Sequence, residues 1–221
     1  KRIIPLSEKV NAKGIFECDV SNEDSIKSIF DEIHDKYGKI DFIVHAIAYS
    51  DKEELKGKYI ETSKKNFLQS MHISCYSFTA VANYASKIMN DGGSMLTLSY
   101  YGAEKVIPHY NVMGVAKAAL EASVMYLSAD LGERAIRVNG ISAGPVKTLA
   151  ASGIGDFRYI LKWNEYNAPL KRNTNLNDVG GAALFLLSNL SSGTTGEILH
   201  VDSGYHVVGM KSPDAPDISV V

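Results

Sequence analysis

The sequence predicts an α/β fold built on a doubly wound parallel sheet, and three observations predict it. Short apolar runs that suit strands alternate along the chain with segments whose apolar residues recur at helical spacing. The clearest strand candidate is apolar almost throughout, as expected of a parallel strand covered on both faces. No internal repeat, low-complexity segment or linker interrupts this pattern, so we expect residues 1–221 to form a single domain.

The first part of the chain predicts two strands separated by a helix. Residues 14–20 form a short strand candidate, and Ser21 is expected to cap the following helix, with Asp24 completing a capping box. Gly38 ends this helix, and residues 40–47 predict a strand covered on both faces. The helix between Ser21 and Gly38 has one apolar face, with apolar residues at positions i, i+3, i+4 and i+7: Ile26, Ile29, Phe30 and Ile33.

The middle of the chain predicts two long helices and two strands. A charged loop at 51–58 precedes a helix expected over 62–89, which is followed by a strand at 94–99. The next helix, 110–131, is apolar nearly all round and is therefore expected to be buried. Residues 136–142 predict the next strand.

The last part of the chain predicts one irregular segment, one helix and one strand. Residues 147–174 are expected to be irregular, and this segment is long for a simple connection. Asn175 or Asn177 can cap a helix that runs to Asn189. Residues 197–201 predict the last strand, which a polar tail follows.

Composition excludes several classes of protein. Apolar residues make up 45%, charged residues 22%, and the net charge is −2, which is typical of globular proteins and argues against a nucleic-acid binder. No apolar run approaches the roughly 18 residues that span a membrane. Cys18 and Cys75 form no paired motif, so we expect a reducing, cytoplasmic compartment. The chain has neither a paired His/Cys motif for a metal nor a G-x-S-x-G nucleophile.

A doubly wound sheet binds its ligands beyond the carboxyl ends of its strands, which here follow Ala46, Ser99 and Ser142. Tyr110 and Lys117 are seven residues apart, so they share one helix face about 10 Å apart along its axis. A lysine in an apolar helix must reach a ligand, a partner or water. From spacing alone, an ammonium that reaches solvent at the helix edge remains an alternative.

Three segments carry a family resemblance: 99–104, 108–117 and 137–154. They resemble the NADH-dependent enoyl-[acyl-carrier-protein] reductases of bacterial type II fatty-acid synthesis, a divergent branch of the short-chain dehydrogenase/reductase family. The resemblance runs from Cys18 to Gly204. Ordinary family members have Tyr-x3-Lys after a catalytic serine. Here the lysine follows at Tyr-x6-Lys, and Tyr100 stands where the serine is expected.

The resemblance implies reduction of the trans-2 double bond of enoyl thioesters on acyl carrier protein, with NADH. It implies that Tyr110 donates a hydrogen bond to the thioester carbonyl, on which negative charge develops as hydride reaches the β-carbon. It assigns the nicotinamide ribose to Lys117 and the acyl pocket to Tyr100, whose ring and hydroxyl suit such a site. These three residues are the predicted catalytic set.

The resemblance also implies two sets of binding residues. For the cofactor, the matching positions are Asp19 and Val20 beside the adenine, Ala46, Ile47 and Ala48 after a strand, Lys117, and Val146 and Thr148 at the carboxamide. For the substrate, they are Tyr49, Tyr100, Tyr110, Met113, Ala150, Ala151, Ile154 and Phe157. Residues 147–174 then become a loop that covers the substrate.

The chain departs from the family pattern at its start, because it has no glycine-rich dinucleotide loop. The resemblance therefore implies that a first strand-helix-strand unit of this Rossmann-like fold is missing. Two alternatives remain: a carbonyl or alcohol oxidoreductase, for which Tyr-x3-Lys would argue, and an inactive fragment that cannot bind cofactor.

The expected partners follow from the family and from the apolar helices. We expect a homotetramer, because the helices at 62–89 and 110–131 are too apolar to be covered on one face only. Lys162, Lys171 and Arg172 could attract the acidic carrier protein, although a solvated loop would carry the same charges. We expect no nucleic-acid, membrane or metal partner.

Overall fold

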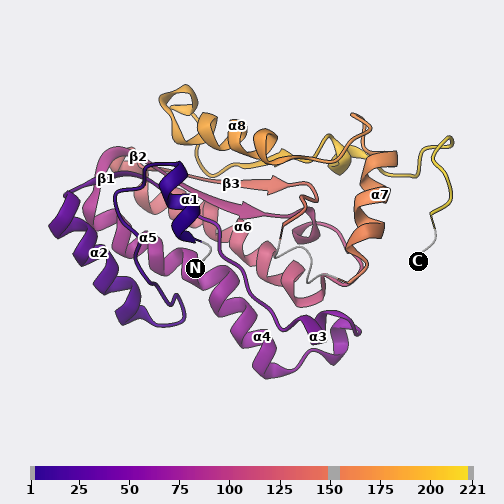
Figure 1. Cartoon of the computed structure of the whole chain (residues 1–221), viewed down its shortest axis with the longest axis horizontal. Coiled ribbons are helices and arrows are strands. Elements are labelled where there is room, and N and C mark those ends of the chain that lie inside the picture. Colours follow the sequence, from indigo (N-terminus) through magenta and orange to yellow (C-terminus); the bar gives the residue numbers. More distant parts are fainter. Residues whose placement is uncertain (1–2, 149–154, 219–221) are drawn as a thin grey trace.

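A parallel sheet forms the centre of the molecule (Figure 1). The computed structural model describes residues 3–148 and 155–218. Within them lie four strands: β1 (Ile40–His45), β2 (Met89–Ser99), β3 (Arg137–Ala143) and β4 (Ile198–Val201). They pair in parallel in the order β1-β2-β3-β4. The predicted α/β fold with a parallel sheet is therefore confirmed.

Helices cover both faces of this sheet. The described helices are α1 (Ile3–Lys9), α2 (Glu23–Tyr37), α3 (Lys52–Leu55), α4 (Lys64–Met71), α5 (Ser77–Ile88), α6 (Asn111–Leu131), α7 (Phe157–Asn167) and α8 (Leu176–Leu187). In Figure 1, α8 lies along one face, while α5 and α6 lie along the other. This arrangement makes the sheet doubly wound, as predicted.

Side-chain caps start the helices that precede and follow the site. The Asn22 side chain accepts hydrogen bonds from the Asp24 and Ser25 amides and so begins α2. The prediction that Ser21 is the cap is therefore wrong by one residue. Gly38 ends α2 at φ 77°, as predicted. Asn175 begins α8 through a capping box, which decides between the two predicted caps.

At the start of the sheet, one predicted strand is absent, and the other is confirmed as β1 but is more exposed than predicted. Residues 14–20 form no strand, because an isolated strand leaves its backbone groups unpaired and none of the described strands lies beside them. β1 is an edge strand of the described sheet, and it is not covered on both faces, since Phe42 is 55% and Val44 46% exposed.

The long helix predicted over 62–89 is interrupted. Ser63 caps α4, a π-helical turn follows at His72–Tyr76, and α5 then leads directly into β2. The segments at 51–58 and 147–174, predicted as irregular, contain the short helix α3 and the helix α7. Amphipathic burial explains α7, because Ile160 and Leu161 on one side are buried while neighbouring positions are exposed.

The main core lies between the sheet and helices α2, α5 and α6. Phe78, Leu120 and Val124 are fully buried in it, together with Val138 of the sheet. In the described residues, α6 is the one helix long and apolar enough to span a membrane. Its buried core residues and its Lys117 identify it as a core helix. Its outer surface is open, because Tyr126 is 76% exposed, so the prediction that it is buried all round is wrong.

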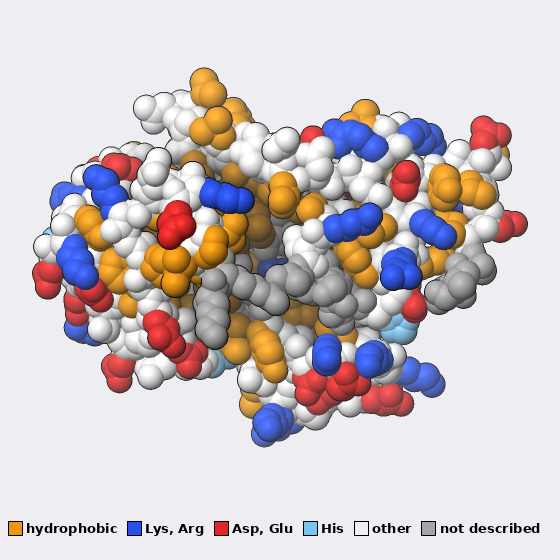
Figure 2. Space-filling model, in the orientation of Figure 1, with side chains coloured by type: hydrophobic (Ala, Val, Ile, Leu, Met, Phe, Trp, Pro, Cys, Tyr) orange, Lys and Arg blue, Asp and Glu red, His pale blue; other side chains and the backbone are white. Residues whose placement is uncertain are grey.

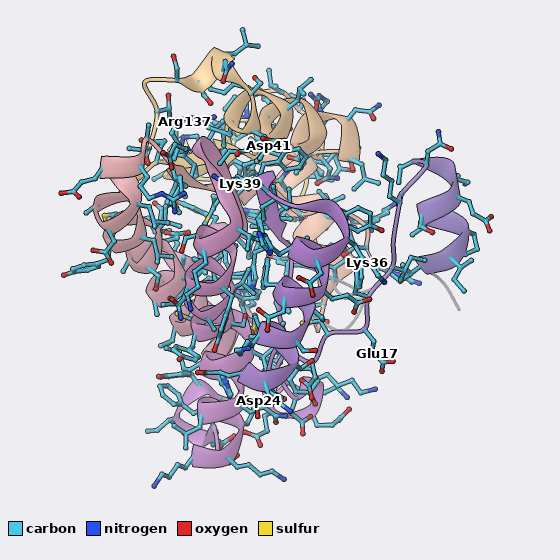
Figure 3. The ribbon with its side chains drawn as sticks, turned by 90° about the vertical axis from the view of Figure 1, so that its left-hand side faces the viewer. Glu17, Asp24, Lys36, Lys39, Asp41 and Arg137 are labelled. Carbon is cyan, nitrogen blue, oxygen red and sulfur yellow. The ribbon has the colours of Figure 1, made fainter. Side chains whose placement is uncertain are left out.

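Polar contacts close the end of the molecule where the strands begin, which faces the viewer in Figure 3. Arg137 at the start of β3 donates to the Leu186 carbonyl at 2.6 Å, to Ser191 Oγ at 2.6 Å and to the Ser188 carbonyl at 3.1 Å. These bonds hold the end of α8 against the sheet. The opposite end, where the strands finish, remains open for a ligand.

Candidate active site

A cavity of about 450 Å³ lies at the carboxyl ends of β1, β2 and β3, bounded by α3, α6 and α8. The face shown in Figure 2 is hollowed near its centre, with apolar side chains around the hollow. Nine of the predicted site residues line this cavity: Ala48, Tyr49, Tyr100, Tyr110, Met113, Lys117, Val146, Thr148 and Phe157. The fold thus brings together residues more than 100 positions apart in sequence.

Tyr110 and Tyr100 meet at the inner wall of the cavity. Tyr110 is the residue before α6, and its ring lies edge-on to that of Tyr100, with the ring centroids 4.9 Å apart. Burial raises the pKa of both phenols, because a phenolate would lose its solvation. Both hydroxyls therefore stay protonated at neutral pH. No hydrogen bond within the described residues engages the Tyr110 hydroxyl, so it can donate to a ligand.

Two glycines allow this close packing. A Cβ atom on Gly102 would lie 2.3 Å from Cδ1 of Tyr110, and one on Gly114 would lie 2.6 Å from the Gly102 carbonyl oxygen. The start of α6 therefore packs directly on the turn after β2. Any side chain at position 114 would collide with backbone. A lysine four residues after Tyr110, as in Tyr-x3-Lys enzymes, is sterically excluded here.

Lys117 reaches the cavity from the next turns of α6. Its side chain is buried, and its ammonium donates a hydrogen bond to the Leu98 carbonyl at 2.6 Å. Burial lowers the pKa of Lys117 to about 8, while the Glu121 carboxylate acts in the opposite direction. The alternative in which this lysine reaches solvent is therefore wrong. At neutral pH the cavity contains a buried cation.

Sequence reasoning missed a buried histidine behind the cavity. His45 at the end of β1 lies 2.8 Å from Ser77 Oγ through Nε2 and 3.2 Å from Thr97 Oγ1 through Nδ1. Burial, with a smaller contribution from the Lys117 charge, lowers the pKa of His45 to about 4. The imidazole is therefore neutral. Only the contacts with β2 and α5 reveal this, since the sequence around His45 reads as an ordinary strand.

Sequence reasoning also missed Asn111, which follows Tyr110. Its side-chain amide donates to the Leu55 carbonyl at 3.1 Å and to the Gly57 carbonyl at 2.9 Å. Asn111 has φ 42°, a left-handed conformation that asparagine adopts more readily than most residues. It therefore fixes the α3 segment to the start of α6. The signal in the sequence that could have identified Asn111 is an asparagine next to the predicted start of a helix.

Four predicted cofactor residues do not line the cavity. Asp19 lies before α2, where its carboxylate accepts from the Ser21 amide at 2.9 Å and the Ser21 hydroxyl at 2.7 Å. Val20 is buried in the main core, and Ala46 and Ile47 follow β1 outside the cavity lining. Three predicted substrate residues, Ala150, Ala151 and Ile154, lie outside the described residues.

The turn after β3 is tight for an internal reason. A Cβ atom on Gly144 would lie 2.5 Å from Thr174 Oγ1 and 2.9 Å from the Asp202 Cα. Glycine is therefore required by the protein's own chain, whether or not a ligand also approaches. Gly144 and Pro145 both line the cavity.

In the part of the chain that the structure describes, no group of three His, Cys, Asp or Glu side chains could hold a metal ion.

Comparisons with known proteins point to one family. The family model described as Enoyl-(Acyl carrier protein) reductase matches residues 1–206. Enoyl-[acyl-carrier-protein] reductase [NADH] 1 of Rhizobium meliloti is 67% identical over 221 residues, which cover 100% of this chain and 81% of that protein. Enoyl-[acyl-carrier-protein] reductase [NADH] FabI of Rickettsia felis is 58% identical over 209 residues, which cover 95% and 80%.

Solved structures agree with the sequence comparisons. The enoyl-(acyl-carrier-protein) reductase of Anaplasma phagocytophilum, solved in complex with NAD, superposes with a TM-score of 0.93 at 63% identity, covering 98% of this chain and 81% of that one. FabI from Candidatus Liberibacter asiaticus superposes with a TM-score of 0.93 at 47% identity, covering 96% and 82%.

Proposed function

The chain belongs to the enoyl-[acyl-carrier-protein] reductase family, and on that premise we propose how its residues perform the reaction. It is an NADH-dependent oxidoreductase of fatty-acid biosynthesis, which reduces the trans-2 double bond of enoyl-[acyl-carrier-protein] thioesters. The observation that supports the assignment of roles is that Tyr110, Tyr100 and Lys117 line one cavity at the carboxyl ends of the strands. The spacing Tyr-x6-Lys, enforced by Gly114, argues against the carbonyl or alcohol oxidoreductase alternative.

The cavity fits a nicotinamide nucleotide. An ammonium has three donors, and the Leu98 carbonyl uses one of those on Lys117, so the others are available for ribose hydroxyls. Val146 and Thr148 line the same cavity after β3, where doubly wound folds hold nucleotides. Lys117, Val146 and Thr148 would thus hold the nicotinamide end. When bound, NADH supplies the hydride that reaches the substrate's β-carbon.

Tyr110 stabilises the charge that develops on the substrate. As the double bond is reduced, negative charge accumulates on the thioester oxygen, and a phenol that donates a hydrogen bond there lowers the barrier. The raised pKa of Tyr110 keeps its proton in place for this task. Tyr100 holds the Tyr110 ring edge-on and provides apolar surface for the acyl chain.

The acyl chain lies between α6 and the segment that follows β3. Tyr49 is 47% exposed and forms the rim of the cavity, while Met113 and Phe157 form its walls. By the family resemblance, Ala150, Ala151 and Ile154 are further substrate-binding residues. Residues 147–174, which include α7, cover the substrate, and residues 1–221 form one oxidoreductase domain.

Kinetics of two variants test these roles. Tyr110→Phe should lower turnover of an enoyl thioester more than tenfold while NADH binding stays nearly intact, because the phenol acts mainly on transition-state charge. Lys117→Ala should mainly weaken NADH binding, measured by fluorescence titration. Unchanged turnover in Tyr110→Phe would remove Tyr110 from the mechanism. A chain that binds no NADH at all would support the inactive-fragment alternative.

The carrier protein is proposed to dock beside α7. Lys and Arg side chains gather on this part of the surface (Figure 2). Lys162 is exposed on α7, and the Lys171 ammonium donates to the Tyr166 carbonyl at 2.9 Å. Arg172, in contrast, is paired with Asp178 through two hydrogen bonds of 2.6 and 3.0 Å. Its charge is therefore largely neutralised, and the two lysines carry the attraction.

Charge reversal tests this docking surface. Lys162→Glu with Lys171→Glu should raise KM for a carrier-linked substrate, and more so at low salt, because surface charges are screened within about 8–10 Å. KM for a small N-acetylcysteamine thioester should stay the same. Lys39→Glu, at the end of the molecule where the strands begin (Figure 3), is the surface control, since Lys39 is also exposed. Equal effects on both substrates would mean that the lysines shape the segment and do not recognise the carrier.

The assembly is proposed to be a homotetramer in the cytoplasm. Exposed apolar side chains on the outer surfaces of α4 and α6, Leu68, Met125 and Tyr126, are 56%, 55% and 76% exposed and offer surfaces for partner subunits. The two cysteines are free, which suits a reducing compartment. Sedimentation at micromolar concentration tests the assembly, and a stable monomer would contradict it.

A further inference from the structure

Two side chains of α6 form hydrogen bonds with the end of β2 beside the cavity. Lys117 and Glu121 are four residues apart and therefore neighbours on one helix face. The Lys117 ammonium donates to the Leu98 carbonyl at 2.6 Å. The next residue, Ser99, donates its hydroxyl hydrogen to the Glu121 carboxylate. Glu121 does not line the cavity, so the roles proposed above leave this half-buried carboxylate without a function.

The charges around Glu121 come from three elements. Lys117 lies on the same helix, Glu104 in the turn after β2, and His200 on β4. His200 Nε2 lies 2.6 Å from the Glu104 carboxylate, so Glu104 already has a partner. Glu104 and His200 act on the pKa of Glu121 in opposite directions and are paired with each other, which leaves the attraction of Lys117 as the remaining effect among these charged groups. Its burial raises the pKa of Glu121, whereas the Ser99 hydrogen bond favours the charged carboxylate.

The charges around Lys117 lead back to Glu121, which attracts the ammonium without a direct ion pair. Besides Glu121, the groups that act on it are the Cys75 thiol of the π-helical turn and the imidazole of His45. His45 is neutral, and burial raises the pKa of the Cys75 thiol, so that thiol is also uncharged at neutral pH. The Glu121 carboxylate is thus the one anion among these groups that can offset the desolvation of the buried ammonium.

We propose that Glu121 is a positioning residue that holds the Lys117 ammonium, charged and in place, at the end of β2. The proposal rests on the proposed role of Lys117 in binding the nicotinamide ribose. The two contacts with consecutive residues of β2 fix α6 against the sheet. They also set the distance between Tyr110 at the start of α6 and Tyr100 after β2. Glu121 itself touches neither cofactor nor substrate.

The dissociation constant of NADH as a function of pH tests the proposal. In the wild type, binding should weaken as the pH rises through about 8, where Lys117 loses its proton. Glu121→Gln keeps the size and the acceptor for Ser99 but removes the charge. Because an opposite charge nearby raises the pKa of an ammonium, the midpoint should fall when that charge is removed, by about one pH unit. Binding at about pH 8 should then weaken severalfold, with little change near pH 6.

Three companion variants separate the possible causes. Ser99→Ala removes the hydrogen bond and keeps the carboxylate, so its midpoint should stay near that of the wild type. Glu121→Asp keeps the charge and should restore most of the wild-type profile. Lys117→Ala should bind NADH weakly at every pH and lose the transition near pH 8. Circular dichroism confirms that each variant is folded.

Two results would overturn the proposal. A Glu121→Gln profile with the wild-type midpoint, or one weakened equally at all pH values, would reduce Glu121 to a packing residue. Should Glu121→Gln not fold, a Glu121→Asp variant that keeps the wild-type transition would support the proposal, and one that binds weakly without a transition would contradict it. A Lys117→Ala variant with wild-type NADH affinity would instead refute the proposed role of Lys117.

Discussion

Adding one methyl group at Gly102 should disable the site without unfolding the protein. The Cβ of Gly102→Ala would lie 2.3 Å from Cδ1 and 2.7 Å from Cε1 of Tyr110. Gly102 lies in the turn after β2, and Gly114 of α6 packs against its carbonyl oxygen. The backbone of Gly102 therefore has little room to move away from the Tyr110 ring. The Tyr110 ring must therefore move.

The size of the movement follows from the contact distances. Ordinary van der Waals contact begins at 3.4 Å, so the ring must move by 1.1 Å, the difference from 2.3 Å. Misplacing a reacting group by about 1 Å can lower a rate by about 100-fold. We therefore expect kcat for an enoyl thioester to fall by about 100-fold. Overpacking of this kind also costs about 1–3 kcal/mol of stability.

Steady-state kinetics and binding together check this prediction. Turnover is followed by NADH absorbance, and the NADH dissociation constant by fluorescence. NADH binding should change by less than about twofold, because Lys117 lies seven residues along α6 from Tyr110, about two turns away. Gly132→Ala is the matched control, since a Cβ there meets no atom within 4 Å and its φ is −63°. That variant should keep wild-type kcat.

Two outcomes would refute this reasoning. Wild-type kcat in Gly102→Ala would show that the ring position does not limit the reaction. A loss confined to the KM for NADH would place the effect at the cofactor and not at Tyr110.

Three further predictions concern stability. The pKa of His45 is about 4 in the folded state and 6.5 in the unfolded state. The contribution of its neutral imidazole to the free energy of unfolding is therefore fully present above pH 6.5 and is lost as the pH falls. At pH 4 this loss should be about 3 kcal/mol for the wild type. Urea unfolding at a series of pH values measures it, and His45→Gln should not lose this stability as the pH falls. Asn111→Ala should cost about 2–3 kcal/mol at neutral pH, from two lost hydrogen bonds and a left-handed φ of 42°; no change in urea midpoint would contradict the proposed anchor. Gly180→Ala in α8, where a Cβ meets no atom within 4 Å, should raise the free energy of unfolding by about 0.5–1 kcal/mol; a decrease would reveal an unseen contact.

Local regularities of the sequence determined the fold class and the shared face of Tyr110 and Lys117. Alternating strand and helix patterns depend on neighbouring residues, and a helix of known pitch places residues seven apart on one side. The ends of helices could be predicted for the same reason, because Gly38 and Asn175 form hydrogen bonds with backbone groups only a few residues away. The family resemblance then supplied the roles that spacing alone left open.

Contacts between distant segments decided the rest. The strand expected at 14–20 depended on a neighbour to pair with, and no local pattern provides one. The pairing of Ser99 with Glu121 joins residues 22 positions apart, and the contact of His45 with Thr97 joins residues 52 positions apart. Such contacts set burial, and burial sets the charge of Lys117 and His45, because the energy of a charge depends on the solvent that the whole fold excludes.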